Sequence, residues 1–211
     1  MSTPPPPRRV GVLGGSFDPP HVGHLILAQE AWWQLGLDEL RLVTAGRPPH
    51  KPGGTTLSGD LRARLVEAAV EGHPGLRCWR VELDREGPSY TADTLAALRA
   101  ELPDAELWFV LGADQLVGLP TWHEPDRIVA LARLAVVSRE GGDPADLHRV
   151  ATDLAPGRVD RVHMPHVAIS STMVRGRLAR GLPVRYLVPD GVERILRAEG
   201  LAAAPRAPSG G

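Results

Sequence analysis

The chain of 211 residues predicts an α/β fold, a parallel sheet with helices on both faces. Two observations point to this class. Short runs rich in β-branched and large apolar residues alternate along the chain with amphipathic stretches of helical period. Several of these runs are apolar almost throughout, which is typical of strands in a parallel sheet covered on both faces. In such a fold the crossovers are right-handed, and ligands bind at the carboxyl ends of the strands.

The expected strands are short apolar runs bounded by turn-forming or charged residues. The first of them leads straight into a glycine pair, which marks its carboxyl end. In chain order the expected strands are Val10–Gly14, Leu40–Thr44, Leu76–Val81, Leu107–Leu111, Leu134–Val137 and Val159–Met164.

The expected helices are stretches in which apolar residues recur every three or four positions. In the first of them, Leu25, Ala28 and Trp32 fall on one face. In chain order the expected helices are Val22–Leu35, Ser58–Val70, Thr91–Ala100, Pro125–Leu131, Pro144–Asp153, Ser171–Ala179 and Gly191–Ala198.

The length of the chain predicts one domain, because about 200 residues bury one substantial core. This domain is expected over residues 9–200, with the last helices, roughly 171–200, forming a small C-terminal subdomain. The proline-rich residues 1–8 and the tail 201–211 are expected to be flexible.

Composition excludes several classes of protein. A net charge of −1 argues against a broad nucleic-acid-binding surface, which needs a basic excess. The single cysteine, Cys78, cannot form an intrachain disulfide and fits the reducing cytoplasm. No apolar run approaches the roughly 18 residues of a membrane span, and the start lacks the apolar core of a signal peptide. We therefore expect a cytoplasmic protein that binds neither nucleic acid nor a membrane, while association of identical chains stays open.

The loop after the first expected strand has the residues of a phosphate-handling site. It reads GGSFDPPHVGH over residues 14–24, so Gly14 and Gly15 remove side chains where a ligand would approach the backbone. The N–H groups of the following helix start point back at that space and favour an anion. The pattern matches neither the dinucleotide-binding G-x-G-x-x-G fingerprint nor the P-loop.

His21 and His24 lie one helical turn apart and share a face near this helix start. A metal site would need a third ligand, and no H-E-x-x-H motif surrounds them. An isolated pair of this kind belongs more often to a core. Beside a glycine loop, however, their N–H groups are placed to donate to phosphoryl oxygens as negative charge develops.

Lys51 is the only lysine among the 24 basic residues of the chain. It follows His50 in the loop GRPPHKPGG, residues 46–54, after the second expected strand. Prolines on either side stiffen the loop, which favours a positioned ammonium over a solvated basic loop.

A second candidate anion site begins the helix expected at Ser171. The segment ISSTMVR, residues 169–175, offers three adjacent hydroxyls, which exceeds what an N-cap requires. Arg175 follows within the first turns, where its guanidinium would bind an anion as a charged fork. Two such sites together with Lys51 indicate a polyphosphate ligand.

Three further segments supply candidates for the rest of a nucleotide. Gly112 and Asp114 follow a buried strand, where Asp114 either accepts hydrogen bonds from ribose hydroxyls or caps a helix. Trp122 lies between prolines, as a stacking partner for a planar ring or as a hydrophobic anchor. In EGPSYTADTL, residues 86–95, Ser89 or Thr91 is expected to cap the following helix.

These motifs, taken together, resemble those of the bacterial nicotinate-nucleotide adenylyltransferases. The segments GGSFDPPHVGH, PPHKP, SYTADTL, FVLGADQL with its later tryptophan, and ISSTMVR occur in the family's order and span residues 11 to about 188. The first and last mark the wider nucleotidylyltransferase superfamily, and the others narrow it to this member. The resemblance implies a Rossmann-like open, mainly parallel sheet with helices on both faces, of the nucleotidylyltransferase type. It also implies transfer of the adenylyl group of ATP to nicotinate mononucleotide, with Mg²⁺ and without a covalent enzyme intermediate.

The resemblance also assigns roles position by position. The implied catalytic residues are His21, His24, Lys51 and Arg175. The implied ATP site, with Arg139 near the adenosine, consists of Gly14, Gly15, Ser16, Phe17, His21, His24, Gly112, Asp114, Arg139, Ile169, Ser170, Ser171 and Arg175. The implied mononucleotide site, with Trp122 stacked on the pyridine ring, consists of Ser16, Phe17, His50, Lys51, Tyr90, Thr91 and Trp122. Mg²⁺ is expected on the phosphates of ATP and on water, with no protein ligand set.

Other functions are weighed against this one. A related transferase would use pantetheine phosphate, a phosphorylated polyol or nicotinamide mononucleotide as acceptor, although Trp122 and the SYT segment disfavour the first two. A nucleotide-binding module without turnover would not need the pair His21 and His24. An NAD-dependent dehydrogenase would need the glycine fingerprint that the first loop lacks.

Overall fold

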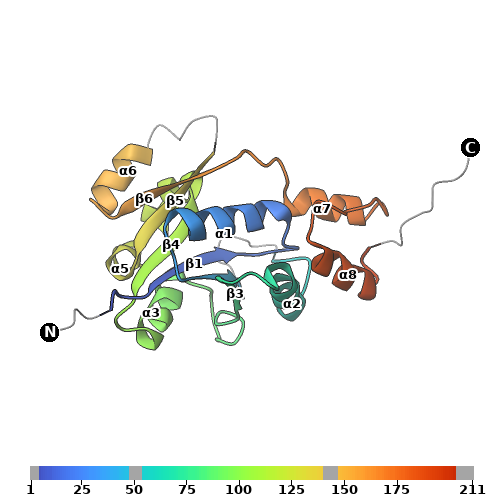
Figure 1. Ribbon diagram of the computed structural model, residues 1–211, viewed down its shortest axis with the longest axis horizontal. Helices are drawn as coiled ribbons and strands as arrows, with labels where there is room; N and C mark the ends of the chain where they lie inside the picture. The colour runs from blue at the N-terminus through green and yellow to red at the C-terminus, as the bar shows by residue number, and fades with distance from the viewer. Residues whose placement is uncertain (1–4, 48–53, 140–146, 203–211) are drawn as a thin grey trace, which may run out of the picture.

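A sheet of parallel strands runs through the centre of the molecule (Figure 1). The computed structural model describes residues 5–47, 54–139 and 147–202, and within them six strands pair in the order β3-β2-β1-β4-β5-β6. Every pairing is parallel, which confirms the predicted Rossmann-like sheet. The strands are β1 (Arg9–Gly15), β2 (Glu39–Thr44), β3 (Leu76–Trp79), β4 (Glu106–Gly112), β5 (Arg133–Arg139) and β6 (Val159–Met164).

The strand order reverses between β1 and β4, the two central strands. From β1 the chain winds outward through β2 to β3, and then returns to place β4 on the other side of β1. The connections therefore leave the carboxyl ends of β1 and β4 in opposite directions, which opens a crevice for a ligand between them. Gly14 and Gly15 end β1 and Gly112 ends β4, so glycine lies on both sides of this crevice.

Helices cover both faces of the sheet (Figure 1). On one face lie α1 (Val22–Gln34) and α2 (Gly59–Val70). On the other lie α3 (Thr91–Glu101), α4 (Ala113–Gly118), the 3-10 helix η1 (Leu119–Thr121), α5 (Pro125–Leu131) and α6 (Leu147–Leu154). Among the described residues, no helix is long and apolar enough to cross a membrane.

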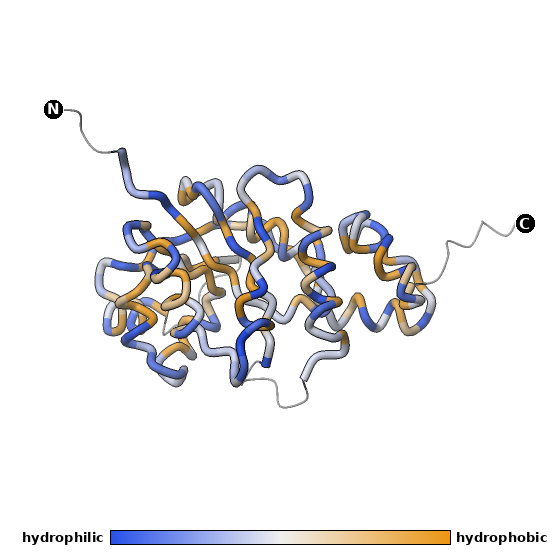
Figure 2. Tube along the Cα trace, turned by 90° about the horizontal axis from the view of Figure 1, so that it is seen from below, coloured by the Kyte–Doolittle hydropathy of each residue, from blue (hydrophilic) through white to orange (hydrophobic). Residues whose placement is uncertain are grey.

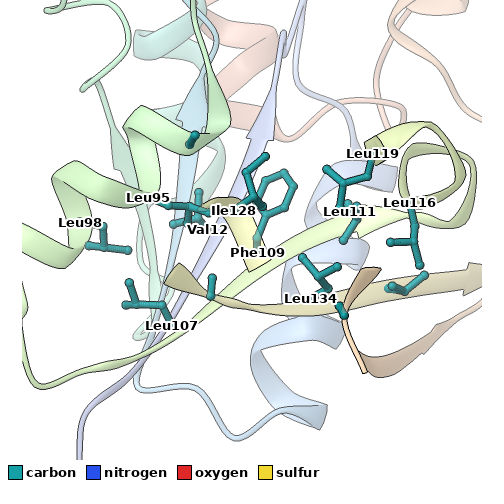
Figure 3. Close-up of a cluster of buried hydrophobic side chains, with 14 of the residues drawn as sticks. Val12, Leu95, Leu98, Leu107, Phe109, Leu111, Leu116, Leu119, Ile128 and Leu134 are labelled. Atoms are coloured by element: carbon teal, nitrogen blue, oxygen red, sulfur yellow. The ribbon is translucent and has the colours of Figure 1, made fainter. Parts of the chain in front are cut away.

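Strand β4 shows why the strands are apolar at nearly every position. Its Leu107 and Phe109 belong to the cluster under α3 and α5, whereas the intervening Trp108 belongs to the cluster under α1. Successive side chains of a strand point to opposite faces, so both clusters draw on the same strand. Figure 3 shows the first cluster, in which Phe109 lies near Ile128 of α5. Along the chain trace, apolar segments gather inside and polar ones outside (Figure 2).

The last two helices, α7 (Ser171–Leu178) and α8 (Asp190–Ala198), lie beyond the carboxyl ends of the strands, beside α2 (Figure 1). They share a third buried cluster with α2, in which Leu65 of α2 packs with Val174 of α7 and Val192 of α8. This packing brings α7 next to the loop that follows β1.

The observed bounds differ from the expected ones mainly in three places. Strand β3 ends at Trp79 rather than Val81, because the backbone turns at Arg80, whose carbonyl accepts the N–H of Leu83 at 2.7 Å. The segment from Ala113 to Thr121 was not among the expected helices but forms α4 and η1, starting where the N–H of Gly112 bonds the Gln115 side chain. The expected helix Pro144–Asp153 is observed as α6, and its first residues lie outside the described part of the chain.

Candidate active site

A cavity of about 800 Å³ opens at the carboxyl ends of β1 and β4. Its walls come from the loop after β1, from α1, from the segment before α3 and from the η1 region. The lining residues are Leu13, Gly14, Gly15, Ser16, Phe17, His24, Leu27, Ala45, Glu82, Ser89, Tyr90, Thr91, Phe109, Gln115, Thr121, Trp122 and His123. The structure therefore brings together predicted residues from both implied nucleotide sites.

The glycine pair at the end of β1 serves two different purposes. A Cβ on Gly14 would meet no atom within 4 Å, so the backbone there is open to the cavity. A Cβ on Gly15 would lie 2.8 Å from the ring of Phe17, which is buried directly beneath it. Phe17 takes a left-handed backbone conformation with φ 45°, a strained choice for an aromatic residue. Gly15 and Phe17 together set the floor of the cavity.

The loop after β1 is held from behind by arginines of two helices. Arg62 of α2, 1% exposed, donates from Nη1 to the carbonyl of Ser16 at 2.7 Å. Arg175 of α7 donates to the carbonyl of Asp18 at 2.6 Å and lies 3.5 Å from its carboxylate. These carbonyls accept hydrogen bonds from outside the cavity, which fixes the loop in one conformation.

The two predicted histidines stack on each other at the start of α1, with ring centroids 3.7 Å apart. His24 lines the cavity and packs edge-on against Phe17, with centroids 5.1 Å apart. Its Nδ1 accepts the backbone N–H of His21 at 3.1 Å. In the neutral ring this acceptor role leaves the proton on Nε2, so His24 is built as a hydrogen-bond donor.

His21 lies behind His24 and does not line the cavity. Its side chain is 7% exposed, and burial lowers the pKa of its imidazole to about 4. The ring is therefore neutral at physiological pH. Its Nδ1 is buried and has no hydrogen-bond partner among the described residues.

Aromatic side chains form the opposite end of the cavity. Tyr90 stacks on His123 with ring centroids 4.0 Å apart, and Thr91 follows at the first position of α3. Trp122 packs edge-on against Phe109, with centroids 6.1 Å apart. The predicted residues Tyr90, Thr91 and Trp122 thus lie around one space of a size and character that suits a flat ring.

The helix cap expected at Ser89 or Thr91 is wrong. Tyr90 is the N-cap residue of α3, and its side chain makes no capping hydrogen bond. The Ser89 hydroxyl oxygen instead accepts the backbone N–H groups of Gly46 and Arg47, at 3.0 and 2.9 Å. Ser89 therefore joins two loops rather than starting a helix.

The start of α7 makes contacts with its own helix and with the loop after β1. The Ser170 hydroxyl accepts the N–H of Met173 at 3.2 Å and so caps the helix, while Ser171 donates to the carbonyl of Pro19 at 2.9 Å. Ile169 packs into the third apolar cluster. None of these residues, nor Arg175, lines the cavity.

The remaining predicted residues lie around the cavity or outside the described chain. Gly112 is the N-cap of α4, and Asp114 lies exposed in its first turn, so neither lines the cavity, although Gln115 does. Arg139 is the last residue of β5. His50 and Lys51 lie outside the described residues.

Sequence reasoning missed several lining residues. Phe109 and Gln115 lie within the recognised motif FVLGADQL and His123 follows Trp122, so their neighbours gave a signal. No sequence signal marked Glu82, because it lies shortly after the edge strand β3 in a segment whose apolar residues show neither helical nor strand spacing. Its carboxyl is mostly buried, and this burial raises its pKa.

Protein ligands for a metal are absent from the part of the chain that the structure describes: no group of three or more His, Cys, Asp or Glu side chains could hold an ion there.

Comparisons with known proteins agree with this geometry. Residues 12–177 match the model of the cytidylyltransferase-like family. A protein of Saccharopolyspora erythraea named probable nicotinate-nucleotide adenylyltransferase is 43% identical over 194 residues, which cover 92% of this chain and 89% of that protein. One of Geobacillus thermodenitrificans with the same name is 40% identical over 196 residues, covering 93% and 87%.

A solved structure shares the fold at low identity. The Plasmodium falciparum nicotinic acid mononucleotide adenylyltransferase complexed with NaAD superimposes with a TM-score of 0.74 and 15% identity, covering 92% of this chain and 97% of that one. At 15% identity this structure shows the fold alone, whereas the family model and the relatives at 40% identity or more show the family. The chain belongs to the cytidylyltransferase-like family and, within it, to the nicotinate-nucleotide adenylyltransferases.

Proposed function

We propose that the protein transfers the adenylyl group of ATP to nicotinate mononucleotide, giving nicotinate adenine dinucleotide and pyrophosphate in NAD biosynthesis. One observation carries the proposal: a single cavity joins a glycine loop and the His24 donor at one end to an aromatic wall at the other. The relatives at 43% and 40% identity carry the name of this activity. The single cysteine fits a cytoplasmic setting, which we include in the proposal.

The proposed reaction is one direct displacement. A phosphate oxygen of the mononucleotide attacks the α-phosphorus of ATP, and a new P–O bond forms there. The bond from the α-phosphorus to the bridging oxygen breaks, and the electron pair leaves with pyrophosphate. The protein then contributes alignment of the two phosphates and stabilisation of the developing charge.

His24 is the residue best placed to stabilise that charge. Its Nδ1 is occupied by the backbone N–H of His21, so its Nε2–H is the donor that we assign to a phosphoryl oxygen. His21 is the second histidine of the proposed site, since its buried Nδ1 has no partner among the described residues. The backbone of Gly14, Ser16 and Phe17 would meet both nucleotides.

Other predicted residues complete the proposed ATP site. The backbone N–H groups of Ser170 and Ser171 and the guanidinium of Arg175 would hold the β,γ-phosphates at the start of α7. Gly112 and Asp114 would contact the ribose. Ile169 would support the α7 start, Arg139 would lie near the adenosine, and Lys51 with His50 would neutralise phosphate charge. Mg²⁺ bound to the phosphates and water would reduce the charge on the departing pyrophosphate.

The test is pyrophosphate release by the purified protein with ATP, Mg²⁺ and one acceptor at a time. The acceptors are nicotinate mononucleotide, nicotinamide mononucleotide and pantetheine phosphate. We expect the highest kcat/KM with nicotinate mononucleotide. A preference for another acceptor would reassign the substrate, and ATP binding without any turnover would favour a regulatory module.

Replacement of the proposed stacking residue tests the acceptor site. Trp122→Ala should weaken binding of nicotinate mononucleotide by roughly 1–3 kcal/mol, because stacking on the ring is lost, while kcat changes little. The control is Trp33→Ala, since Trp33 is 74% exposed on α1 and does not line the cavity. Unchanged acceptor affinity in Trp122→Ala would make this tryptophan a hydrophobic anchor only.

A further inference from the structure

Glu82 places a carboxylate in the wall of a cavity that is proposed to bind phosphates. It lies between β3 and α3, on the side of Tyr90 and Thr91, and the proposed chemistry gives it no task. Each substrate carries negative phosphate groups, so a carboxylate at this place would weaken binding unless it did other work. Its contacts show what that work is.

The groups around Glu82 are hydrogen-bond donors aimed at its carboxylate. Thr94, 2% exposed in the first turn of α3, donates its hydroxyl proton to Oε1 at 2.7 Å. The Ser89 hydroxyl and the N–H of Gly46 also face this carboxylate, and both act to lower its pKa. Because the Ser89 oxygen already accepts the N–H groups of Gly46 and Arg47, its one proton is left to donate to Glu82.

These bonds join three parts of the chain at one side chain. Ser89 and Thr94 flank Tyr90 and Thr91, the residues that line the acceptor end of the cavity. Gly46 belongs to the loop after β2, and a Cβ there would collide with the backbone carbonyl of Glu82. The positive charge of Arg85 also faces the carboxylate.

We propose that Glu82 is a positioning residue for the acceptor: its carboxylate orients Ser89 and Thr94 and thereby fixes Tyr90 and Thr91 against the mononucleotide. This inference rests on the proposed function. A carboxylate is required because the Thr94 hydroxyl donates to it and the Ser89 hydroxyl has only its proton left to offer. A glutamine would turn an NH₂ group toward at least one of these donors and leave it without an acceptor.

The decisive variant is Glu82→Gln, which keeps the size and shape of the side chain. We expect KM for nicotinate mononucleotide to rise on the order of tenfold, because the partners of a charged acceptor are lost. KM for ATP and kcat should stay within about twofold, since the Thr94 hydroxyl that bonds Glu82 belongs to α3 and not to α1 or the loop after β1. A purely structural defect would lower the active fraction, and so kcat, without this selective change in KM.

The matched control is Glu86→Gln, which removes the same charge from an exposed position in the same segment and should leave both KM values unchanged. Thr94→Val should reproduce part of the effect of Glu82→Gln. In the double variant the two effects should combine to less than their sum, because both remove the same hydrogen bond.

A calorimetric titration of nicotinate mononucleotide into each variant keeps the test independent of turnover. A wild-type protein that binds this mononucleotide but releases no pyrophosphate would remove the proposed function and leave the inference standing. Wild-type affinity in Glu82→Gln, or an equal loss of affinity for ATP, would overturn the inference alone.

Discussion

Helices α1 and α7 both begin beside the loop that follows β1, and the sequence predicts an anion site at each. At α1, His24 faces the cavity and is built to donate from Nε2. At α7, the Ser170 hydroxyl caps its own helix, and Ser171 and Arg175 bond to backbone carbonyls of the loop. One helix start opens on the ligand space, and the other braces the loop that borders it.

This difference shows that hydroxyl, imidazole and guanidinium groups at a helix start do not by themselves identify a ligand site. Such groups serve either a ligand or the chain itself, and the sequence does not say which. The structure decides by showing where the donors already point. Four experiments test how complete this division between α1 and α7 is.

The largest effect is expected at α1. His24→Ala should lower kcat by about 10²–10³-fold, because it removes a donor to charge that develops in the transition state. The KM for the acceptor should hardly change, and steady-state kinetics with both substrates varied gives both values. Gln29→Ala, an exposed change on the same helix, is the control. A large rise in KM at unchanged kcat would move His24 from transition-state stabilisation to ground-state binding.

The buried His21 makes stability depend on pH at the α1 start. Burial lowers the pKa of its folded form to about 4, below the ordinary histidine value of 6.5, so on acidification the unfolded chain takes up the proton first. The stability conferred by the neutral, buried ring is fully present above pH 6.5. It is lost as pH falls from 6.5 to 4, by about 3 kcal/mol at most.

Urea unfolding of the wild type and of His21→Asn across this pH range measures that dependence. The difference between the two curves removes the contribution of the other titrating groups, such as Asp160, whose pKa is lowered by its hydrogen bond to Arg133. If the free energy of unfolding changed with pH in the same way in both proteins, the His21 ring would be in contact with water in the folded state. Helix α7 has no buried histidine, so this acid sensitivity belongs to α1.

The part of the site that could be predicted from the sequence is the part that local patterns encode. The alternation of apolar runs and helices predicted the sheet and placed Gly14 and Gly15 at its carboxyl edge, because these are local patterns. The bond from Ser89 to Gly46 spans 43 positions in the chain, and no local pattern encodes it. Glu82 was missed for the same reason, and α4 and η1 were missed because the segment Ala113–Thr121 contains Gly118 and Pro120.

A smaller effect is expected when Arg175 of α7, which holds the loop after β1, loses its charge. Arg175→Gln should raise KM for ATP roughly tenfold if the guanidinium holds the β,γ-phosphates as proposed. It should also lower the free energy of unfolding, because the Asp18 carbonyl loses a donor and its carboxylate a nearby cation. Kinetics and urea unfolding on the same preparation separate the two effects. Lower stability with unchanged KM for ATP would confine α7 to bracing the loop.

The smallest effect is expected at the cap of α7. Ser170→Ala should lower the free energy of unfolding by about 1 kcal/mol, because the N–H of Met173 loses its acceptor. Ser58→Ala is the matched variant, since Ser58 caps α2 in the same way by accepting the N–H of Leu61. Both should keep the wild-type KM for ATP, because each hydroxyl is used within its own helix. A rise in KM for ATP in Ser170→Ala alone would show that this hydroxyl leaves the cap to bind phosphate, and the two helix starts would then both be ligand sites.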